Sequence, residues 1–236
     1  QYGPNYQGTP EFTKFMKAKS LILAFGLLLA GANANALQKV KRVGGVEFYQ
    51  IGTATELVEF AELVNGTNPG ACGELTADID YPDQTAVIGT NGAFSGEFEG
   101  NGHKITYNLT ATGENFALFH EIANGSVIRN LVVDGTVTTN NKFTGTIVSM
   151  LYGSVENCIS FATINTTLNG DGTHGGLIGR SWAGGSVKNC VFAGKMSGSA
   201  THSCGGIVGW TNGLVTMNTC LQIADIKVDP SGGATL

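Results

Sequence analysis

The chain has little charge and little proline, and these scarcities exclude several classes of protein. Charged residues make up 13% of the 236 residues, and only 5 residues are proline. Disorder needs high charge and low hydrophobicity, whereas 42% of this chain is hydrophobic, so a disordered chain is excluded. Collagen is excluded as well, because the abundant glycine does not recur at every third position.

Basic residues are especially scarce, and the formal net charge is −5. No Lys or Arg occurs between Arg42 and Lys104, although this stretch is rich in Asp and Glu. A surface that follows nucleic-acid phosphates needs clustered basic side chains, so nucleic-acid binding is not expected. The acidic stretch is interpreted instead as a face exposed to solvent.

Hydrophobic runs long enough to span a bilayer are also missing, since a transmembrane helix takes about 20 apolar residues. One shorter run, residues 20–30, follows two lysines and precedes the small residues of 34–36. This order is typical of a secretory signal peptide over residues 16–36 that is cleaved after Ala36. It predicts a secreted or cell-surface protein with no transmembrane segment in the mature chain.

Neither end of the sequence has the pattern expected at the end of a complete domain. Residues 1–15 precede the leader and are interpreted as translated upstream sequence or an expression scar. At the other end, Ser-Gly-Gly at 231–233 resembles Cys-Gly-Gly at 204–206, as if a further repeat were beginning. Natural repeat arrays cap their last unit, so we expect the sequence to be a fragment of a longer protein.

One segment has the pattern of an amphipathic helix. Thr53 and Glu56 are spaced as in a capping box, which opens a helix. Apolar residues then recur at helical spacing, at Leu57, Phe60, Ala61 and Val64. Asn-Gly at 65–66 is expected to end the helix. We expect this helix to cover the first open rung of the strand array that follows it.

The remainder, rich in 35 glycines, has the pattern of short strands joined by tight turns. Apolar residues alternate with polar ones over 94–98 and 105–109, as in strands with one buried face. Gly-Asn-Gly at 100–102 is a turn between them, because Gly and Asn tolerate positive φ.

From about residue 116 the sequence repeats itself. Similar apolar triplets recur at 117–119, 146–148, 176–178 and 206–208, at steps of 29, 30 and 30 residues. Further strand-like segments follow each triplet, which gives three short strands per unit, the content of one rung of a β-solenoid. We expect one inward-facing column of residues, formed by Leu118, Ile147, Leu177 and Ile207.

The sequence therefore predicts an all-β fold, a right-handed parallel β-helix with rungs of about 30 residues and an N-terminal capping helix. Residues 37–115 are assigned to the cap and the first rungs. Residues 116–236 are assigned to the repeats proper.

Two motifs make the resemblance to a family specific. Gly-Gly-Leu-Ile-Gly at 175–179 and Gly-Gly-Ile-Val-Gly at 205–209 resemble the GLUG repeats of bacterial surface and adhesin-like proteins. Residues 94–105 are similar to the FxGxFDGNGHxI segment that often leads such arrays, with Glu99 where Asp is usual. The resemblance covers about residues 50–230 and implies an extracellular, often adhesive role. It implies no catalytic residues.

Three cysteines and three asparagines recur at equivalent positions of successive rungs: Cys158, Cys190, Cys220, Asn130, Asn157 and Asn189. Leu131 takes the cysteine position one rung earlier, which favours buried packing for these thiols. Zinc binding needs CxxC pairs, which are absent. Disulfides are left open for an exported protein, with Cys72 and Cys204 as the odd pair, although five cysteines cannot all pair within one chain. The asparagines are interpreted as a hydrogen-bonded ladder, with a sugar-binding row as the alternative.

No cofactor is expected, although a Ca²⁺ site is left open. Asp78, Asp80 and Asp83 could supply the hard oxygen ligands that Ca²⁺ prefers. Their spacing lacks the glycine and the distal Glu of an EF-hand loop. On a strand, alternating Asp78 and Asp80 would simply face solvent, which is the favoured interpretation.

Trp182 and Trp210 occupy similar rung positions 28 residues apart and could stack on sugar rings, or simply pack at the turns. We therefore expect a non-catalytic extracellular adhesion protein with a glycan or a surface protein as partner. A β-helix polysaccharide lyase or hydrolase is the alternative, since Asp171, His174 and His103 invite that comparison. A passive spacer in a larger surface protein is a third interpretation.

Overall fold

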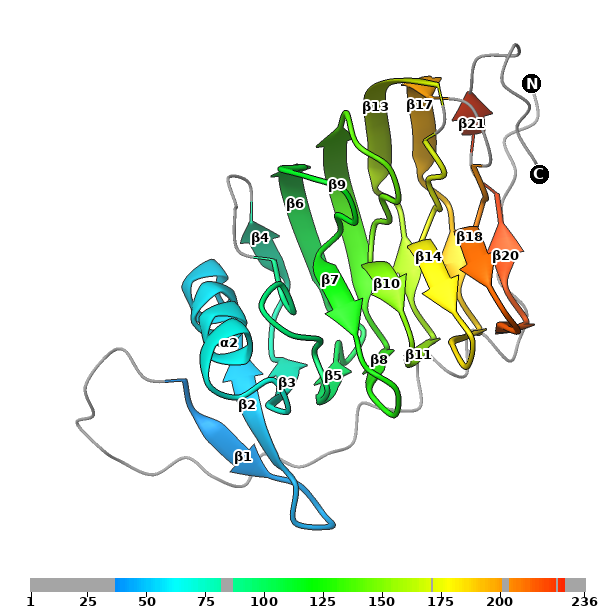
Figure 1. Ribbon diagram of the computed structural model, residues 1–236. Helices are drawn as coiled ribbons and strands as arrows, with labels where there is room; N and C mark the ends of the chain where they lie inside the picture. The colour runs from blue at the N-terminus through cyan, green and yellow to red at the C-terminus, as the bar shows by residue number, and fades with distance from the viewer. Residues whose placement is uncertain (1–36, 82–86, 171, 201–203, 224, 228–236) are drawn as a thin grey trace, which may run out of the picture. The chain divides into compact units, whose positions relative to one another are not determined.

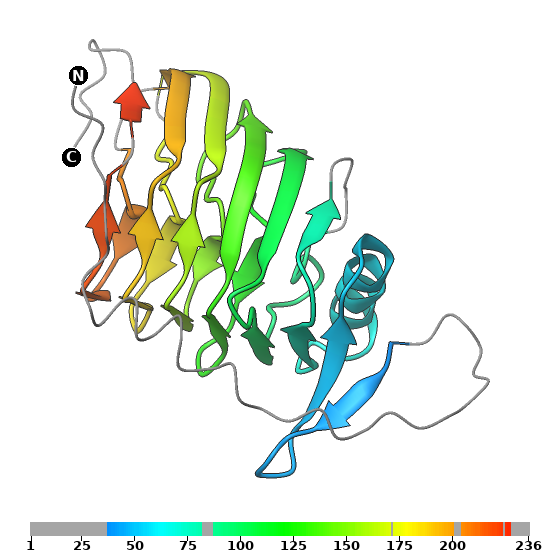
Figure 2. The same cartoon turned by 180° about the vertical axis from the view of Figure 1, so that it is seen from behind.

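The computed structural model describes residues 37–81, 87–170, 172–200, 204–223 and 225–227. The chain forms a parallel β-solenoid of about 5 turns, with 48% of the described residues in strands and 7% in helix. Figures 1 and 2 show successive strands side by side, from β2 and β3 next to the helix to β18 and β20 at the other end. The predicted β-helix is confirmed.

Several sequence features lie outside the described residues. These are the upstream segment 1–15, the leader at 16–36, Asp83, Asp171 and the repeat start at 231–233. Within the described ranges, no helix is long and apolar enough to cross a membrane.

Three sheets run along the solenoid, and each rung adds a segment to them. Sheet A contains eight strands in the order β1 (Lys39–Lys41), β2 (Glu47–Ile51), β3 (Cys72–Leu75), β5 (Glu97–Glu99), β8 (Val127–Arg129), β11 (Ser154–Glu156), β15 (Ser186–Lys188) and β19 (Thr216–Asn218). Only the first pair, β1 with β2, is antiparallel in this sheet.

Sheets B and C are parallel throughout their described strands. Sheet B contains β4 (Ile79–Tyr81), β6 (Lys104–Thr110), β9 (Val132–Thr139), β12 (Ile159–Ser160), β13 (Thr163–Gly170), β16 (Val191–Phe192), β17 (Lys195–Ala200), β20 (Leu221–Gln222) and β21 (Asp225–Lys227). Sheet C contains β7 (Phe119–Ile122), β10 (Val148–Leu151), β14 (Ile178–Trp182) and β18 (Val208–Asn212).

The register of sheet C follows the repeat in the sequence. Val148 pairs with Phe119 on one side and with Ile178 on the other. The residues one position earlier in each rung are also joined by backbone hydrogen bonds. The N–H of Ile147 donates to the Leu177 carbonyl, and the N–H of Leu177 donates to the Ile207 carbonyl. Leu118, Ile147 and Leu177 are fully buried and Ile207 is partly buried, so the predicted inward column is present.

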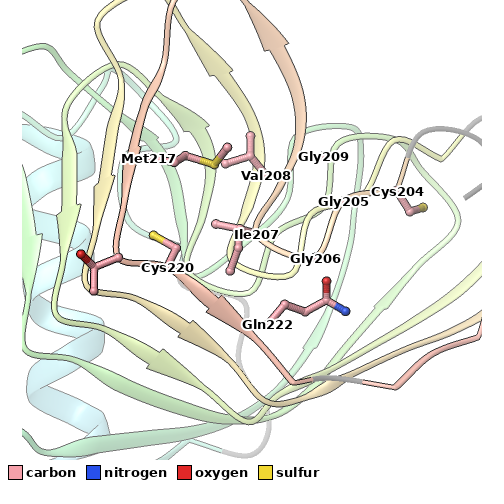
Figure 3. A pocket seen from close by; sticks show the side chains of 10 residues that line it. Cys204, Gly205, Gly206, Ile207, Val208, Gly209, Met217, Cys220 and Gln222 are labelled. Carbon is pink, nitrogen blue, oxygen red and sulfur yellow. The ribbon is translucent and has the colours of Figure 1, made fainter. Parts of the chain in front are cut away.

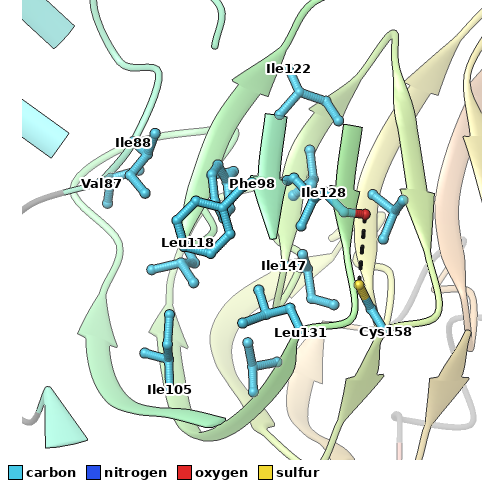
Figure 4. Packing of buried hydrophobic residues seen from close by; sticks show 14 of the residues in the cluster. Val87, Ile88, Phe98, Ile105, Leu118, Ile122, Ile128, Leu131, Ile147 and Cys158 are labelled. Carbon is cyan, nitrogen blue, oxygen red and sulfur yellow. Dashed lines mark hydrogen bonds between the residues drawn. The ribbon is translucent and has the colours of Figure 1, made fainter. Parts of the chain in front are cut away.

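The interior is filled by apolar side chains from all three sheets, and one cluster extends from Ile51 to Phe192. Figure 4 shows a part of it, with Phe98, Leu118 and Ile147 among the labelled residues. Near the helix its centre is aromatic. The ring of Phe98 lies 5.8 Å from that of Phe60 and 5.1 Å from that of Phe119, between centroids. Each rung therefore buries its apolar residues against its neighbours, as expected for a solenoid.

The predicted capping helix is α2 (Ala54–Gly66). The Thr53 hydroxyl accepts a hydrogen bond from the Glu56 N–H, and the Glu56 carboxylate accepts one from the Gly52 N–H, as in a capping box. The four apolar residues expected to face inward are the buried ones: Leu57, Phe60, Ala61 and Val64. The helix thus covers the apolar end of the first rungs.

The predicted helix end is confirmed. Gly66 is the last helical residue, and the cap is Thr67, whose N–H donates to the Leu63 carbonyl. The Asn65 side chain has a further role: its amide donates to the Val87 carbonyl and its oxygen accepts from Gly89 N–H. Asn65 thus fastens the end of the helix to the adjacent rung.

Candidate binding face on sheet C

Five side chains gather outside the core on sheet C and its preceding loop. We call them the aromatic face: Phe143, Tyr152, Arg180, Trp182 and Trp210. None of them belongs to the hydrophobic core cluster. Register explains the grouping, because Met150, Arg180 and Trp210 are paired across β10, β14 and β18. Residues paired in this way lie about 4.8 Å apart along the solenoid.

The rings of the aromatic face contact one another across three successive rungs. Tyr152 and Trp182 are stacked, with centroids 6.0 Å apart and planes at 8°. Trp182 meets Trp210 edge to face at 5.7 Å and 80°, and Trp210 meets Phe143 at 6.2 Å. Trp210 is the most open of the four, with 37% of its surface exposed. Such a row offers flat apolar surface to a ligand.

Arg180 lies among these rings. Its guanidinium carbon is 4.8 Å from the Phe143 ring centroid and 5.6 Å from that of Trp182, within cation–π range. One terminal nitrogen donates to the Met150 sulfur over 2.8 Å. The buried Nε of Arg180 and the buried indole nitrogen of Trp182 have no hydrogen-bond partner among the described residues.

Phe143 is held in a left-handed conformation, with φ of 60°. Bulky residues rarely adopt this conformation, so surrounding contacts must impose it. The Phe143 N–H donates to the Gly172 carbonyl, and its own carbonyl accepts from the Ser149 hydroxyl over 2.8 Å. A Cβ on Gly179 would lie 2.1 Å from that carbonyl oxygen, so the last glycine of this repeat motif makes room for the Phe143 backbone.

The sequence indicated the two tryptophans, and the structure brings their rings together. The expected similar rung position was wrong by two residues, because Trp210 pairs with Arg180 and Trp182 pairs with Asn212. The sequence did not indicate Phe143, Tyr152 or Arg180. Tyr152 directly follows β10, whose Leu151 pairs with Ser181, so the repeat register alone could have placed Tyr152 beside Trp182.

The three asparagines stack on the corner between sheets A and B. The side-chain amide of Asn157 donates to Asn130 and that of Asn189 donates to Asn157, each over 3.2 Å. All three have a φ between 52° and 55°, as the sharp corner requires. The ladder begins on Glu99, whose carboxylate accepts from the Asn130 amide and from Arg129. These contacts hold the corner together and occupy the amide groups that a sugar would need.

The three cysteines stack in the interior next to that corner. Cys158 and Cys190 are fully buried, with Leu131 in the same cluster, whereas Cys220 is partly buried. Burial raises the pKa of the Cys158 and Cys220 thiols, whereas the hydrogen bond with Cys158 lowers the pKa of Cys190. Cys158 and Cys190 have no exposed surface, so this environment suits packing rather than chemistry. No disulfide joins any two cysteines of the described residues.

The acidic residues of the Ca²⁺ hypothesis do not converge in the described residues. Asp78 accepts hydrogen bonds from the Lys104 N–H over 3.0 Å and pairs with His103 over 3.1 Å. These contacts lower the pKa of Asp78, the Lys104 N–H most of all. Asp80 faces outward on β4. No group of three His, Cys, Asp or Glu side chains suitable for a metal is found in the described ranges.

The two histidines of the enzyme hypothesis lie at different corners. His103 lies between β5 and β6, whereas His174 lies between β13 and β14, two rungs further on. His174 is fully buried, accepts from the Thr144 N–H at Nδ1 over 3.4 Å and contacts the Thr166 hydroxyl through Nε2 over 3.1 Å. With both ring nitrogens engaged, His174 helps to fasten one loop to the next.

Two cavities accompany these features. One of about 520 Å³ lies at the last described rung and is lined by Ile207, Met217, Cys220 and Gln222 among others (Figure 3). Ile207 and Cys220 pack against the hydrophobic core, so this cavity lies where the interior of the solenoid opens at the last described rung. A second cavity, about 260 Å³, lies beside the loop that precedes β7, next to Glu114 and His120.

Comparisons with known proteins support the fold and leave the activity open. A crystal structure from Bacteroides ovatus, described as a "putative immunoglobulin A1 protease", has a TM-score of 0.53 at 18% identity, covering 80% of this chain and 78% of the other. At that identity the likeness shows the fold alone.

Sequence similarity is local. Halomucin of Haloquadratum walsbyi is 33% identical over 98 residues, which are 41% of this chain but 1% of halomucin. No family model matches the chain.

Proposed function

We propose that the protein is a non-catalytic binding scaffold at the cell surface, which holds a glycan against the aromatic face of sheet C. The observation that carries this proposal is the row of contacting rings from Tyr152 to Trp210, open to solvent at Trp210. Aromatic faces bury the apolar side of a sugar ring with little loss of side-chain freedom. An extended solenoid side suits such a chain-like ligand better than a small enclosed substrate.

Other features also support a surface role. The pattern of residues 16–36 is that of an export leader. The motifs at 175–179 and 205–209 resemble GLUG repeats of adhesin-like proteins, and the local similarity to halomucin is compatible with an extracellular setting. The thiols and histidines described above are engaged in packing or hydrogen bonds, which favours binding over catalysis.

A glycan array followed by calorimetric titration tests this function. We expect Trp210→Ala to weaken binding about tenfold or more, which corresponds to about 1.4 kcal/mol. Phe161→Ala is the matched control, because Phe161 is an exposed aromatic residue next to sheet B, with 48% of its surface exposed. Its loss should leave affinity unchanged.

A reducing-sugar assay on the same glycans separates binding from turnover. Turnover of any bound glycan would overturn the non-catalytic proposal. Equal losses of affinity in the Trp210 and Phe161 variants would show that the aromatic face is not the binding site.

A further inference from the structure

We propose that the aromatic face selects anionic saccharides and that Arg180 pairs with their carboxylate or sulfate group. This inference rests on the proposed function and names the ligand class for the same site. Three observations support it: the pairing of the other arginines, the unused donors of Arg180, and the rings on either side of it.

Arg180 differs from the other two arginines of the chain. Arg42 pairs with Glu74, and Arg129 pairs with Glu99 over 2.9 Å and also with Glu97. Arg180 forms no ion pair with any carboxylate of the described residues. On sheet A, charges of opposite sign neutralise each other, whereas on sheet C one guanidinium lacks a counter-charge.

The local charges leave that guanidinium positive. The acidic residue aligned with it on sheet C is Glu121, which pairs with Met150, which in turn pairs with Arg180. Two strand spacings, roughly 9–10 Å, therefore separate the two backbones. No hydrogen bond or ion pair joins the Glu121 carboxylate to the guanidinium among the described residues.

The hydrogen-bonding capacity of Arg180 is also largely unused. A guanidinium has five N–H donors, and the Met150 sulfur that takes one of them is a weak acceptor. The buried Nε has no acceptor among the described residues. A buried unpaired donor is costly, and such a group calls for a physical reason. A carboxylate or sulfate that meets the planar fork would provide strong charge-assisted bonds.

The flanking rings indicate that the anionic group is attached to a sugar. Phe143 and Trp182 flank the guanidinium, and Trp182 continues into the stacked pair with Tyr152. An acidic sugar residue can place its ring against this aromatic surface and its charged group on Arg180. An acidic peptide could satisfy the charge but would leave the flat rings without a matching partner.

Hexasaccharides of equal length test the inference by calorimetric titration. The probes are hexagalacturonate, its fully methyl-esterified neutral form, and a κ-carrageenan hexasaccharide that carries sulfate but no carboxylate. We expect at least one anionic probe to bind tenfold or more tightly than the neutral one. The stronger of the two distinguishes carboxylate from sulfate, and added salt should weaken it.

Variants assign the preference to Arg180. Arg180→Gln should remove the difference between anionic and neutral probes, and Arg180→Lys should retain part of it, since a lysine keeps the charge without the fork. Lys195→Gln is the control, because Lys195 is exposed on sheet B and its loss removes the same charge. The melting curve of each variant shows that it is folded.

The possible outcomes distinguish a failure of this inference from a failure of the proposed glycan-binding function. Equal binding of neutral and anionic probes by the unaltered protein, lost in Trp210→Ala, overturns the anionic preference and keeps the glycan function. An anionic preference that persists in Arg180→Gln overturns the role of Arg180. Binding of poly-glutamate in place of any saccharide overturns the ligand class, and with it the proposed glycan function.

Discussion

Shortening Leu177 to alanine tests the interior column that the repeats predict. Leu177 is fully buried, and the backbone of this position is bonded to the rungs before and after it. Removing three carbons loses about 2.4 kcal/mol, at about 0.8 kcal/mol for each buried carbon. The cavity left behind adds to this, so the free energy of unfolding should fall by about 2–5 kcal/mol.

Leu214→Ala is the matched control, because it makes the same chemical change at a residue that is 90% exposed. Its effect should stay within about 0.5 kcal/mol. Urea unfolding followed by circular dichroism compares the two variants. Leu177→Asp should lower the free energy of unfolding more than Leu177→Ala does, since an unpaired buried charge costs several kcal/mol more.

Hydrogen exchange shows which strands lose amide protection in Leu177→Ala. A solenoid is stabilised by contacts between neighbouring rungs, so Leu177→Ala should reduce protection in β10, β14 and β18 more than in β3. Equal unfolding midpoints for Leu177→Ala and Leu214→Ala would refute the assignment of Leu177 to the core. Uniform loss of protection along the chain would refute the nearest-neighbour reasoning.

Three further predictions concern single residues. Tyr107→Phe removes the hydroxyl that donates to the Thr146 carbonyl over 2.6 Å and should cost about 1–3 kcal/mol in urea unfolding, whereas an unchanged midpoint would contradict this. Burial raises the pKa of Tyr81 to about 12. The unfolded chain loses this proton first, near pH 10. Stability should therefore be complete below about pH 10 and fall as the pH rises towards 12; Tyr81→Phe should reduce this fall in pH-dependent unfolding. Phe143→Asn should leave the unfolding free energy within about 1 kcal/mol of the original yet weaken glycan binding about tenfold; parallel losses of both would contradict this.

The sequence was informative wherever burial follows a period. The step of about 30 residues places Leu118, Ile147 and Leu177 in one column because every rung must bury the same face. The helical spacing of Phe60 and Val64 likewise identified the buried side of α2. These features are repeated locally, so they need no knowledge of distant contacts.

Contacts that do not repeat from rung to rung could not be predicted from the sequence. The side chain of Asn65 fastens the end of the helix to the adjacent rung by bonds to residues 22 to 25 positions later. Glu99, which replaces the usual Asp of the leading motif, uses its longer side chain to contact Arg129 and Asn130 on the next rung. Nothing in a window around either residue indicates these partners.

The aromatic face was predictable only in part, for the same reason. Trp182 and Trp210 were indicated by their spacing of 28 residues, although the register pairs Trp210 with Arg180 and Trp182 with Asn212; this register could have added Tyr152 and Arg180. Phe143 could not be added, since its ring reaches Trp210 only through a left-handed backbone that a phenylalanine rarely adopts.

That backbone also gives a reason to regard the aromatic face as more than packing. Asn115 has the same left-handed conformation one rung earlier, with φ of 61°, and Asn accepts it at little cost. Thr173 has a similar φ of 47° one rung later, so this turn imposes the left-handed conformation on the residue that stands there. Phenylalanine at 143 bears a strain of roughly 1–2 kcal/mol that asparagine would avoid. Asparagine, however, would place no ring over Arg180, so phenylalanine fits the proposed ligand, which uses the ring and the guanidinium together.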